Sequence, residues 1–174
     1  MSEQNFKDWE TPAFVIETLE KRLITKHFEI DVAASPTNAK ANKYLTKEDN
    51  GLTRPWSSRE SGFCTYAWCN PPYQNIIAWL NKAIQETENN VHTTMLLPAS
   101  TDTKWFHQAR KSPHCDIGFI EGRIRFFDSR TDSIGRSPAI GNILVQVAIN
   151  IACSSYAQLA ADAVSEAIKV RKND

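Results

Sequence analysis

Hydrophobic and polar positions follow two periods along the chain, one typical of helices and one typical of strands. Apolar residues recur at helical spacing in four segments, which predict amphipathic helices: residues 11–23, 76–86, 103–112 and 155–172. Shorter apolar runs predict strands: residues 27–35, 63–69, 93–99, 115–122 and 141–149. Helices and strands that alternate in this way are typical of a layered α/β fold.

Two proline-containing dipeptides mark predicted helix starts. Thr11 and Pro12 suit the N-cap and the first helical residue of the first helix. Ser35 and Pro36 offer a further helix start after the first predicted strand. Residues 121–139 interrupt the alternation with a polar and basic stretch, which we interpret as a loop-like insert.

The size and composition of the chain limit the number of domains and the class of protein. Its 174 residues suffice for one hydrophobic core but are few for two, and we expect a single domain over 1–174. Hydrophobic residues make up 41% and charged residues 23%, values that exclude a disordered or fibrous chain. Because the net charge is zero, any affinity for nucleic acid must come from a local basic patch.

We expect neither a membrane anchor nor a metal site. No apolar run has membrane-spanning length, and the polar N-terminus lacks the pattern of a signal peptide, so the prediction is a cytoplasmic protein. Histidines and cysteines show no metal-ligand spacing. The cysteines lie scattered in apolar stretches and are expected to be buried thiols: Cys64, Cys69, Cys115 and Cys153.

The most polar interruptions follow predicted strands. They are Asp31 with its neighbours, Asp49 with its neighbours, and the tetrapeptide Asn-Pro-Pro-Tyr at 70–73. In open α/β sheets, ligands bind in the crevice outside the carboxyl ends of the strands. We therefore expect these three segments to contribute to a ligand site.

The tetrapeptide at 70–73 combines rigid acceptors with an aromatic ring. Pro71 and Pro72 each fix φ and lack an N–H, which places the Pro71 carbonyl rigidly. Asn70 adds a side-chain carbonyl oxygen. Two fixed acceptors beside the Tyr73 ring suit a planar group with an exocyclic amine, such as adenine. The alternative is a rigid turn with Tyr73 packed on the core, and the tetrapeptide alone does not decide between the two.

Several segments together resemble the small phage-type DNA N6-adenine methyltransferases, which use S-adenosylmethionine. The tetrapeptide after a strand is similar to the motif of amino-group methyltransferases. The resembling segments cover most of residues 8–147: DWETPAFVIETLE, FEIDVAASPTNAKANKYLTKEDNGL, WCNPPYQNIIAWLNKA, LLPASTDTKWFH, GFIEGRIRF and RSPAIGNILV. The resemblance implies a Rossmann-like methyltransferase domain with a mostly parallel central sheet. It also implies that double-stranded DNA is the substrate, and that a phage uses the enzyme to mark its DNA against host restriction.

The resemblance implies that S-adenosylmethionine lies across the first strand ends. Residues 31–35 stand where many methyltransferases carry an acid and a glycine-rich loop, but the glycines are absent. Ala33 is small enough to let a ligand approach, and Ser35 precedes the expected helix start, whose free N–H groups would face a carboxylate. Asp31 would hold the ammonium or ribose hydroxyls of the cofactor, and capping of the next helix is the alternative.

Two further segments complete the implied cofactor site. Asp49 is a second candidate ligand, for which a solvated loop acid is the alternative, and Leu52 would cover the adenine of the cofactor. Trp9, Thr11 and Pro12 resemble part of the family's N-terminal segment, which closes over the methionine end of the cofactor. An ordinary helix cap is the alternative for Thr11 and Pro12.

Basic residues lie in and before the expected insert and interleave with Trp105, Phe126 and Phe127. This combination suits phosphate contact and base stacking, whereas a solvated charged face is the alternative. Given the methyltransferase resemblance, we expect these basic residues to form the DNA-binding surface: Lys104, Arg110, Lys111, Arg123, Arg125, Arg130 and Arg136.

The implied mechanism is direct in-line transfer of a methyl group to the exocyclic nitrogen of a flipped adenine. Asn70 and the Pro71 carbonyl would orient the amine, so positioning supplies most of the rate enhancement. Asn70 is neutral where related enzymes carry Asp. Amine methylation needs no covalent step through Cys69, which we expect to be a small buried residue.

Two rival hypotheses stay open at this point. The same acceptors would serve methylation of an RNA adenine or a protein glutamine. A catalytically silent nucleic-acid-binding module is the other rival, and the missing glycine-rich loop favours it. The sequence specifies neither the DNA recognition site nor the oligomeric state.

Overall fold

The computed structural model describes residues 9–23, 27–57, 64–128, 133–134, 140–148 and 156–173. Its helices are α1 (Ala13–Glu20), α2 (Ile76–Glu86), α3 (Lys104–Lys111) and α4 (Tyr156–Asn173), with short 3₁₀ helices η1 (Tyr73–Asn75) and η2 (Thr87–Asn89). Its strands are β1 (Trp9–Glu10), β2 (Ile30–Asp31), β3 (Lys43–Tyr44), β4 (Thr65–Cys69), β5 (Val91–Pro98), β6 (Cys115–Phe119), β7 (Phe127–Asp128), β8 (Ser133–Ile134) and β9 (Asn142–Val147). No helix in these described ranges is both long enough and apolar enough to cross a membrane.

A six-stranded sheet in the order β3-β2-β4-β5-β9-β6 forms the centre of the protein. β2 pairs in parallel with β3 and β4, and β4 pairs in parallel with β5. β9 inserts antiparallel between β5 and β6. This arrangement confirms the predicted α/β class with a mostly parallel sheet and fits a Rossmann-like fold.

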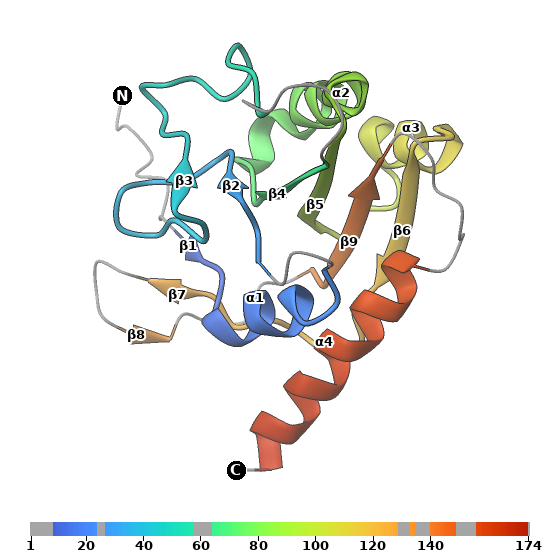
Figure 1. Ribbon diagram of the computed structural model, residues 1–174. Coiled ribbons are helices and arrows are strands. Elements are labelled where there is room, and N and C mark those ends of the chain that lie inside the picture. Colours follow the sequence, from blue (N-terminus) through green and yellow to red (C-terminus); the bar gives the residue numbers. More distant parts are fainter. Residues whose placement is uncertain are drawn as a thin grey trace, which may run out of the picture.

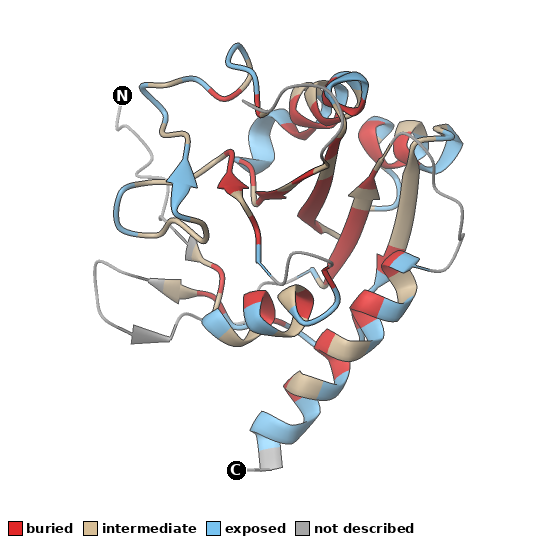
Figure 2. Cartoon of the chain, viewed as in Figure 1, coloured by how far each residue is buried: buried red, intermediate tan, exposed pale blue. Residues whose placement is uncertain are grey.

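Helices cover both faces of this sheet (Figure 1). α2 and α3 pack on one face, and α1 and α4 pack on the other. Successive strand residues serve opposite faces, since Met95 and Leu97 pack with α2 and α3 whereas Leu96 packs with α1 and α4. β5 and β9 are therefore buried along most of their length (Figure 2), which explains the apolar runs at 95–97 and 143–145.

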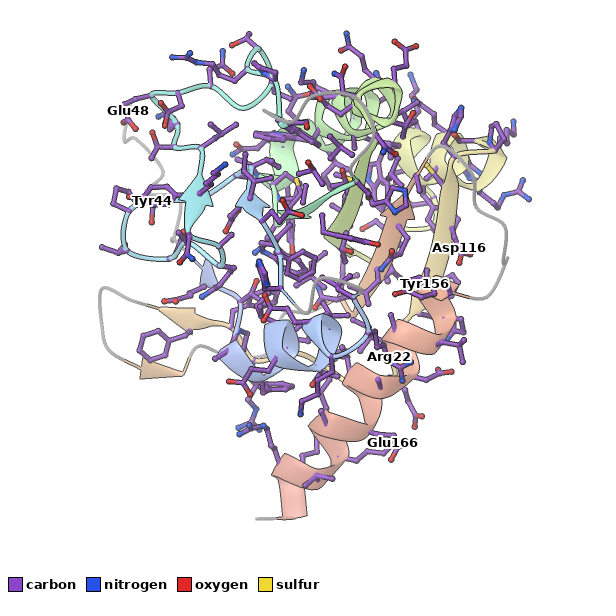
Figure 3. The ribbon with its side chains drawn as sticks, viewed as in Figure 1. Arg22, Tyr44, Glu48, Asp116, Tyr156 and Glu166 are labelled. Atoms are coloured by element: carbon purple, nitrogen blue, oxygen red, sulfur yellow. The ribbon has the colours of Figure 1, made fainter. Side chains whose placement is uncertain are left out.

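Helix α4 begins against β6, and specific contacts fix it there. A Cβ atom at Gly118 would lie 2.0 Å from the Ala157 carbonyl oxygen, so only glycine permits this approach. Asp116 Oδ2 accepts the Ala157 N–H at 2.8 Å, and the Tyr156 hydroxyl donates to the Arg22 carbonyl at 2.9 Å (Figure 3). These contacts tie α4 to the sheet edge and to the segment that follows α1.

The segment after β2 is a turn and a loop, so the helix start predicted at Ser35 and Pro36 is wrong. Short polar side chains accept hydrogen bonds from backbone N–H groups in this segment. Asn38 Oδ1 accepts the Ser35 N–H at 2.6 Å, and Asp31 Oδ2 accepts the Lys40 N–H at 3.0 Å. Local side-chain hydrogen bonds of this kind compete with helix formation. The loop then returns the chain to form β3 beside β2.

Helix α1 begins one residue later than predicted. Pro12 occupies the N-cap position and Ala13 is the first helical residue, so the prediction of Thr11 as the N-cap is wrong. Thr11 is 2% exposed, and its hydroxyl accepts a hydrogen bond from a side chain distant in sequence. The buried hydroxyl makes this tertiary contact in place of a helix cap.

The described part of the stretch at 121–139 packs against the rest of the fold and consists of an irregular segment at 121–126 followed by two short strands. β7 pairs antiparallel with β1 and with β8, which gives a small three-stranded sheet. Ile124 and Phe126 are buried in the core beneath α1 and α4. In the sequence, these apolar residues alternate with Arg123 and Arg125. The polar and basic appearance of the segment therefore did not indicate that it covers the core. Residues 129–132 and 135–139 lie outside the described part.

Candidate active site

The carboxyl ends of β2 and β4 lie side by side in the sheet. These parallel strands are neighbours, with Asp31 in register with Trp68. Asn70 follows directly after β4 and therefore lies close to the end of β2. This is the sheet edge at which the sequence predicted a ligand site.

A cleft opens at these strand ends, and we call it the strand-end cleft. Its volume is about 30 Å³, and it is lined by Glu10, Thr11, Asp31, Ala33, Asn38, Lys40, Trp68 and Asn70. The structure thus brings together four residues that the sequence predicted for the site: Thr11, Asp31, Ala33 and Asn70. A larger hollow of about 240 Å³ lies near the other ends of β2 and β4, where Ile30 and Thr65 line it, and none of the predicted site residues lines that hollow.

Asn70 and Thr11 are joined by a side-chain hydrogen bond. The amide Nδ2 of Asn70 donates to Thr11 Oγ1 at 3.2 Å. An asparagine amide has one donor group and one acceptor oxygen. The bond to Thr11 therefore leaves the Asn70 Oδ1 atom available as an acceptor.

Asp31 is a buried carboxylate that organises the loop after β2. Only 3% of the residue is exposed, and its oxygens accept the N–H groups of Ala33 at 3.2 Å and Lys40 at 3.0 Å. Burial raises the pKa of Asp31 to about 6, against the lowering effect of these two hydrogen bonds and the Lys40 charge. No helix follows it, so the alternative that Asp31 caps one is wrong.

Lys40 and Glu10 form an ion pair at the cleft that sequence analysis missed. Lys40 Nζ lies 2.6 Å from Glu10 Oε1. Glu10 could have been noticed as the neighbour of Thr11. Lys40 lies nine residues beyond Asp31 in a segment that was expected to be helical, so no sequence signal placed it in the site.

Tyr73 begins η1 directly after the two prolines, of which Pro71 is buried and Pro72 is exposed. The residue is 46% exposed, so the alternative in which its ring packs on the core is wrong. Burial raises the pKa of Tyr73 to about 12, while a hydrogen bond with Asn142 acts in the opposite direction. An exposed ring with an anchored hydroxyl is a suitable platform for a planar ligand.

Asn142 is a second polar residue that sequence analysis missed. It begins β9 opposite Pro98 of β5 and is 3% exposed. Its Nδ2 donates to the Leu97 carbonyl at 3.4 Å, whereas its buried Oδ1 has no hydrogen-bond partner among the described residues. A polar residue at the start of the apolar run 141–149 was the available signal.

Comparison with known proteins agrees with this geometry. A family model described as DNA N-6-adenine-methyltransferase (Dam) matches residues 2–163. The chain belongs to this Dam family. Membership confirms the resemblance that the six sequence segments indicated.

Two Dam-family relatives come from phages. A DNA N-6-adenine-methyltransferase of Escherichia phage T1 is 38% identical over 113 residues, which are 65% of this chain and 44% of the relative. A protein of the same name from Haemophilus phage HP1 is 32% identical over 124 residues, which are 71% of this chain and 68% of the relative. The match thus spans less than half of the phage T1 protein. No solved structure is a significant match for the chain.

Four other residues predicted to bind cofactor are not among those that line the strand-end cleft: Pro12, Ser35, Asp49 and Leu52. Asp49 accepts hydrogen bonds from the N–H and the hydroxyl of Thr46, which lower the pKa of Asp49. Leu52 is half-buried against the core beneath α2, and Ser35 bonds to Asn38 within the loop. Pro12 is the N-cap of α1, and Trp9 lies in β1. Their binding roles stay predictions.

The structure places the described basic residues in two separate groups. Lys104, Arg110 and Lys111 are exposed on α3, whereas Arg123 and Arg125 are exposed between β6 and β7. α3 and β7 lie well apart in Figure 1. The two groups therefore do not form one continuous patch in the described structure. Arg130 and Arg136 lie outside the described residues.

Cys69 has the environment of a structural thiol. It is 0% exposed, and burial, together with the Asp31 charge, raises the pKa of Cys69 well above its usual value. This confirms the predicted buried thiol, whereas Cys64 and Cys115 are only partly buried and Cys153 lies outside the described residues. Among the described residues, no three His, Cys, Asp or Glu side chains gather in a group that could hold a metal.

Proposed function

We propose that this protein is an S-adenosylmethionine-dependent methyltransferase that transfers a methyl group to N6 of adenine in double-stranded DNA. Membership of the Dam family supports this proposal. The observation that carries it is the hydrogen bond from Asn70 to Thr11 at the end of β4. It leaves an acceptor oxygen beside the rigid Pro71 carbonyl, which is the arrangement that an exocyclic amine requires.

Asn70 and Pro71 act on the target amine through position. Asn70 Oδ1 and the Pro71 carbonyl each accept one hydrogen of the amine and orient its nitrogen for in-line attack. They also favour the developing positive charge on that nitrogen. Asn70 is no base at neutral pH, so the proton leaves the amine for water after transfer.

The residues of the strand-end cleft fit the chemistry of S-adenosylmethionine. When bound, this cofactor supplies an activated methyl group on a sulfonium. Glu10 and Asp31 offer carboxylates for its positive groups, Lys40 offers a cation for its carboxylate, and Ala33 leaves space beside them.

Tyr73 and the basic residues are assigned to DNA. The exposed Tyr73 ring stacks on an adenine that has been turned out of the duplex, because the stack shields N6 from the enzyme. Arg123 and Arg125, or the basic residues of α3, contact backbone phosphates. An enzyme with these substrates acts in the cytoplasm, which is the host cytoplasm for a phage-encoded protein.

Transfer of labelled methyl groups from S-adenosylmethionine tests the proposal. We expect label in N6-methyladenine of unmethylated duplex DNA, and none in RNA or in protein glutamine. Asn70→Ala, purified in the same way, controls for a contaminating enzyme and should show transfer that is slower by about 100-fold or more. Label in RNA or protein alone would change the substrate, whereas binding of DNA without any transfer would identify a silent binding module.

A further inference from the structure

Glu10 and Lys40 form an ion pair at the edge of the strand-end cleft. Lys40 Nζ lies 2.6 Å from Glu10 Oε1, and the two side chains are only 12% and 22% exposed. Glu10 belongs to β1, and Lys40 belongs to the loop between β2 and β3, so the pair joins two segments that border the cleft. The Lys40 N–H also donates to Asp31, which fixes the lysine beside the end of β2.

A ligand that contacts both Glu10 and Lys40 must separate their side chains, because these two bond to each other at 2.6 Å. Parting them separates a largely buried ion pair, and an unpaired charge in a protein interior is costly. A ligand that carries both a carboxylate and an ammonium can replace each partner as the pair opens. A neutral ligand offers no such replacement.

We propose that Glu10 and Lys40 bind the amino-acid end of S-adenosylmethionine, with Lys40 pairing with its carboxylate and Glu10 with its ammonium. This inference rests on the proposed function, which supplies the identity of the ligand. The amino-acid end carries both charges, whereas the adenosine end carries none. Asp31 keeps its two backbone hydrogen bonds, so the loop after β2 needs no refolding when the pair opens.

Calorimetric titration with two ligands tests this assignment. S-adenosylhomocysteine carries the amino-acid end, and 5′-methylthioadenosine lacks it but keeps the adenosine and the sulfur. Lys40→Gln should weaken binding of S-adenosylhomocysteine about 10- to 100-fold, as expected for a lost charged hydrogen bond. Its affinity for 5′-methylthioadenosine should stay the same, because this ligand lacks the carboxylate that pairs with Lys40.

Three further variants complete the experiment. Glu10→Gln should act in the same direction as Lys40→Gln, and Lys40→Arg should retain most of the affinity for S-adenosylhomocysteine. Lys43→Gln removes an equal charge from an exposed position on β3 and should change neither affinity. A thermal unfolding curve for each variant checks that it is folded.

The possible outcomes separate the inference from the proposed function. An equal loss of both ligands in Lys40→Gln would assign Lys40 to the fold of the cleft, and an unchanged affinity for S-adenosylhomocysteine would place the amino-acid end elsewhere. Either result overturns the inference but leaves the proposed function standing. Wild-type protein that binds neither ligand would instead refute both.

Discussion

Asn70 Nδ2 lies 3.2 Å from Thr11 Oγ1 and donates a hydrogen bond to it across 59 positions of sequence. Because an amide offers only one acceptor oxygen, this bond determines which end of Asn70 is left for a ligand. We therefore propose that Thr11 orients the Asn70 side chain through this bond.

Thr11→Val removes the acceptor while keeping the size of this buried side chain. We expect the single-turnover rate of DNA methylation to fall about 5- to 10-fold, the effect of losing about 1 kcal/mol of orientation from one hydrogen bond. Thr11→Ser keeps the hydroxyl and should stay close to the wild-type rate. A Thr11→Val enzyme with an unchanged rate would show that the Asn70 amide needs no such support.

Two replacements of Asn70 distinguish the role of its acceptor oxygen from that of its NH2 group. Asn70→Ala should slow methyl transfer about 100-fold or more, the usual effect of removing one group that stabilises charge in the transition state. Asn70→Asp should retain substantial activity, because the Thr11 hydroxyl can donate to a carboxylate as well as accept from an amide. Cofactor affinity, measured by calorimetry, should change little in Asn70→Ala. A near wild-type rate for that variant would remove Asn70 from the target site.

Sequence patterns predicted the elements that pack on the sheet more accurately than the loops that form the site. α2 spans Ile76–Glu86, as its apolar spacing predicted, and β9 spans Asn142–Val147 within the predicted strand 141–149. The helical and strand periods of a sequence reflect which residues face the core, and both of these segments pack against the core of the sheet.

The loop between β2 and β3 could not be predicted, because long-range contacts decide its path. Pro36 suggested a helix, but the Asp31 carboxylate holds the backbone of Ala33 and Lys40, and Glu10 from β1 holds the Lys40 side chain. Periodicity carries no information about such contacts. For the same reason, the motif at 70–73 indicated the target site, whereas the partner of Asn70 became apparent only in the structure.

Asp31 should make folding stability depend on pH. Burial raises its folded pKa from 3.8 to about 6, so between these values the folded protein binds the proton more tightly than the unfolded chain does. The stability contributed by this proton is present below the unfolded pKa and is lost as pH rises through the folded pKa. The predicted loss is about 3 kcal/mol relative to Asp31→Asn, which does not titrate.

Urea unfolding of wild type and Asp31→Asn at about pH 4 and about pH 7 measures this loss. The difference in unfolding free energy between the two proteins should shift by about 2 kcal/mol in favour of Asp31→Asn at the higher pH, because at pH 4 the unfolded carboxyl is already partly ionised. Parallel changes in both proteins would contradict the raised pKa. Asp31→Ala, tested at neutral pH, should in addition weaken binding of S-adenosylmethionine more than binding of DNA.

Tyr73 should contribute to binding of the target base through stacking of its ring. Tyr73→Ala is expected to weaken capture of the target base by about 1–3 kcal/mol, the range for lost stacking of one base. The KM for DNA should rise accordingly. Tyr73→Phe keeps the ring and should have a milder effect. If both variants are equally damaged, the hydroxyl and its contact with Asn142 matter more than the exposed ring.

The basic residues form two separate groups, so their roles in DNA binding can be tested separately. Neutralising a phosphate contact weakens binding to all sequences and lowers the salt slope of log K by about one unit. We expect this result for Arg125→Gln, which lies between β6 and β7, or for Arg110→Gln on α3, and cofactor affinity should be unchanged in both. Binding to unrelated duplexes over a salt series measures the slope.

These two single variants also identify the face that meets DNA. If only Arg125→Gln lowers the slope, the segment between β6 and β7 meets the DNA backbone, and if only Arg110→Gln does so, α3 meets it. A loss of about 1–3 kcal/mol confined to one preferred sequence would instead indicate a guanine contact. Unchanged affinity and slope in both variants would contradict the DNA-binding assignment and leave these arginines as solvated surface charges.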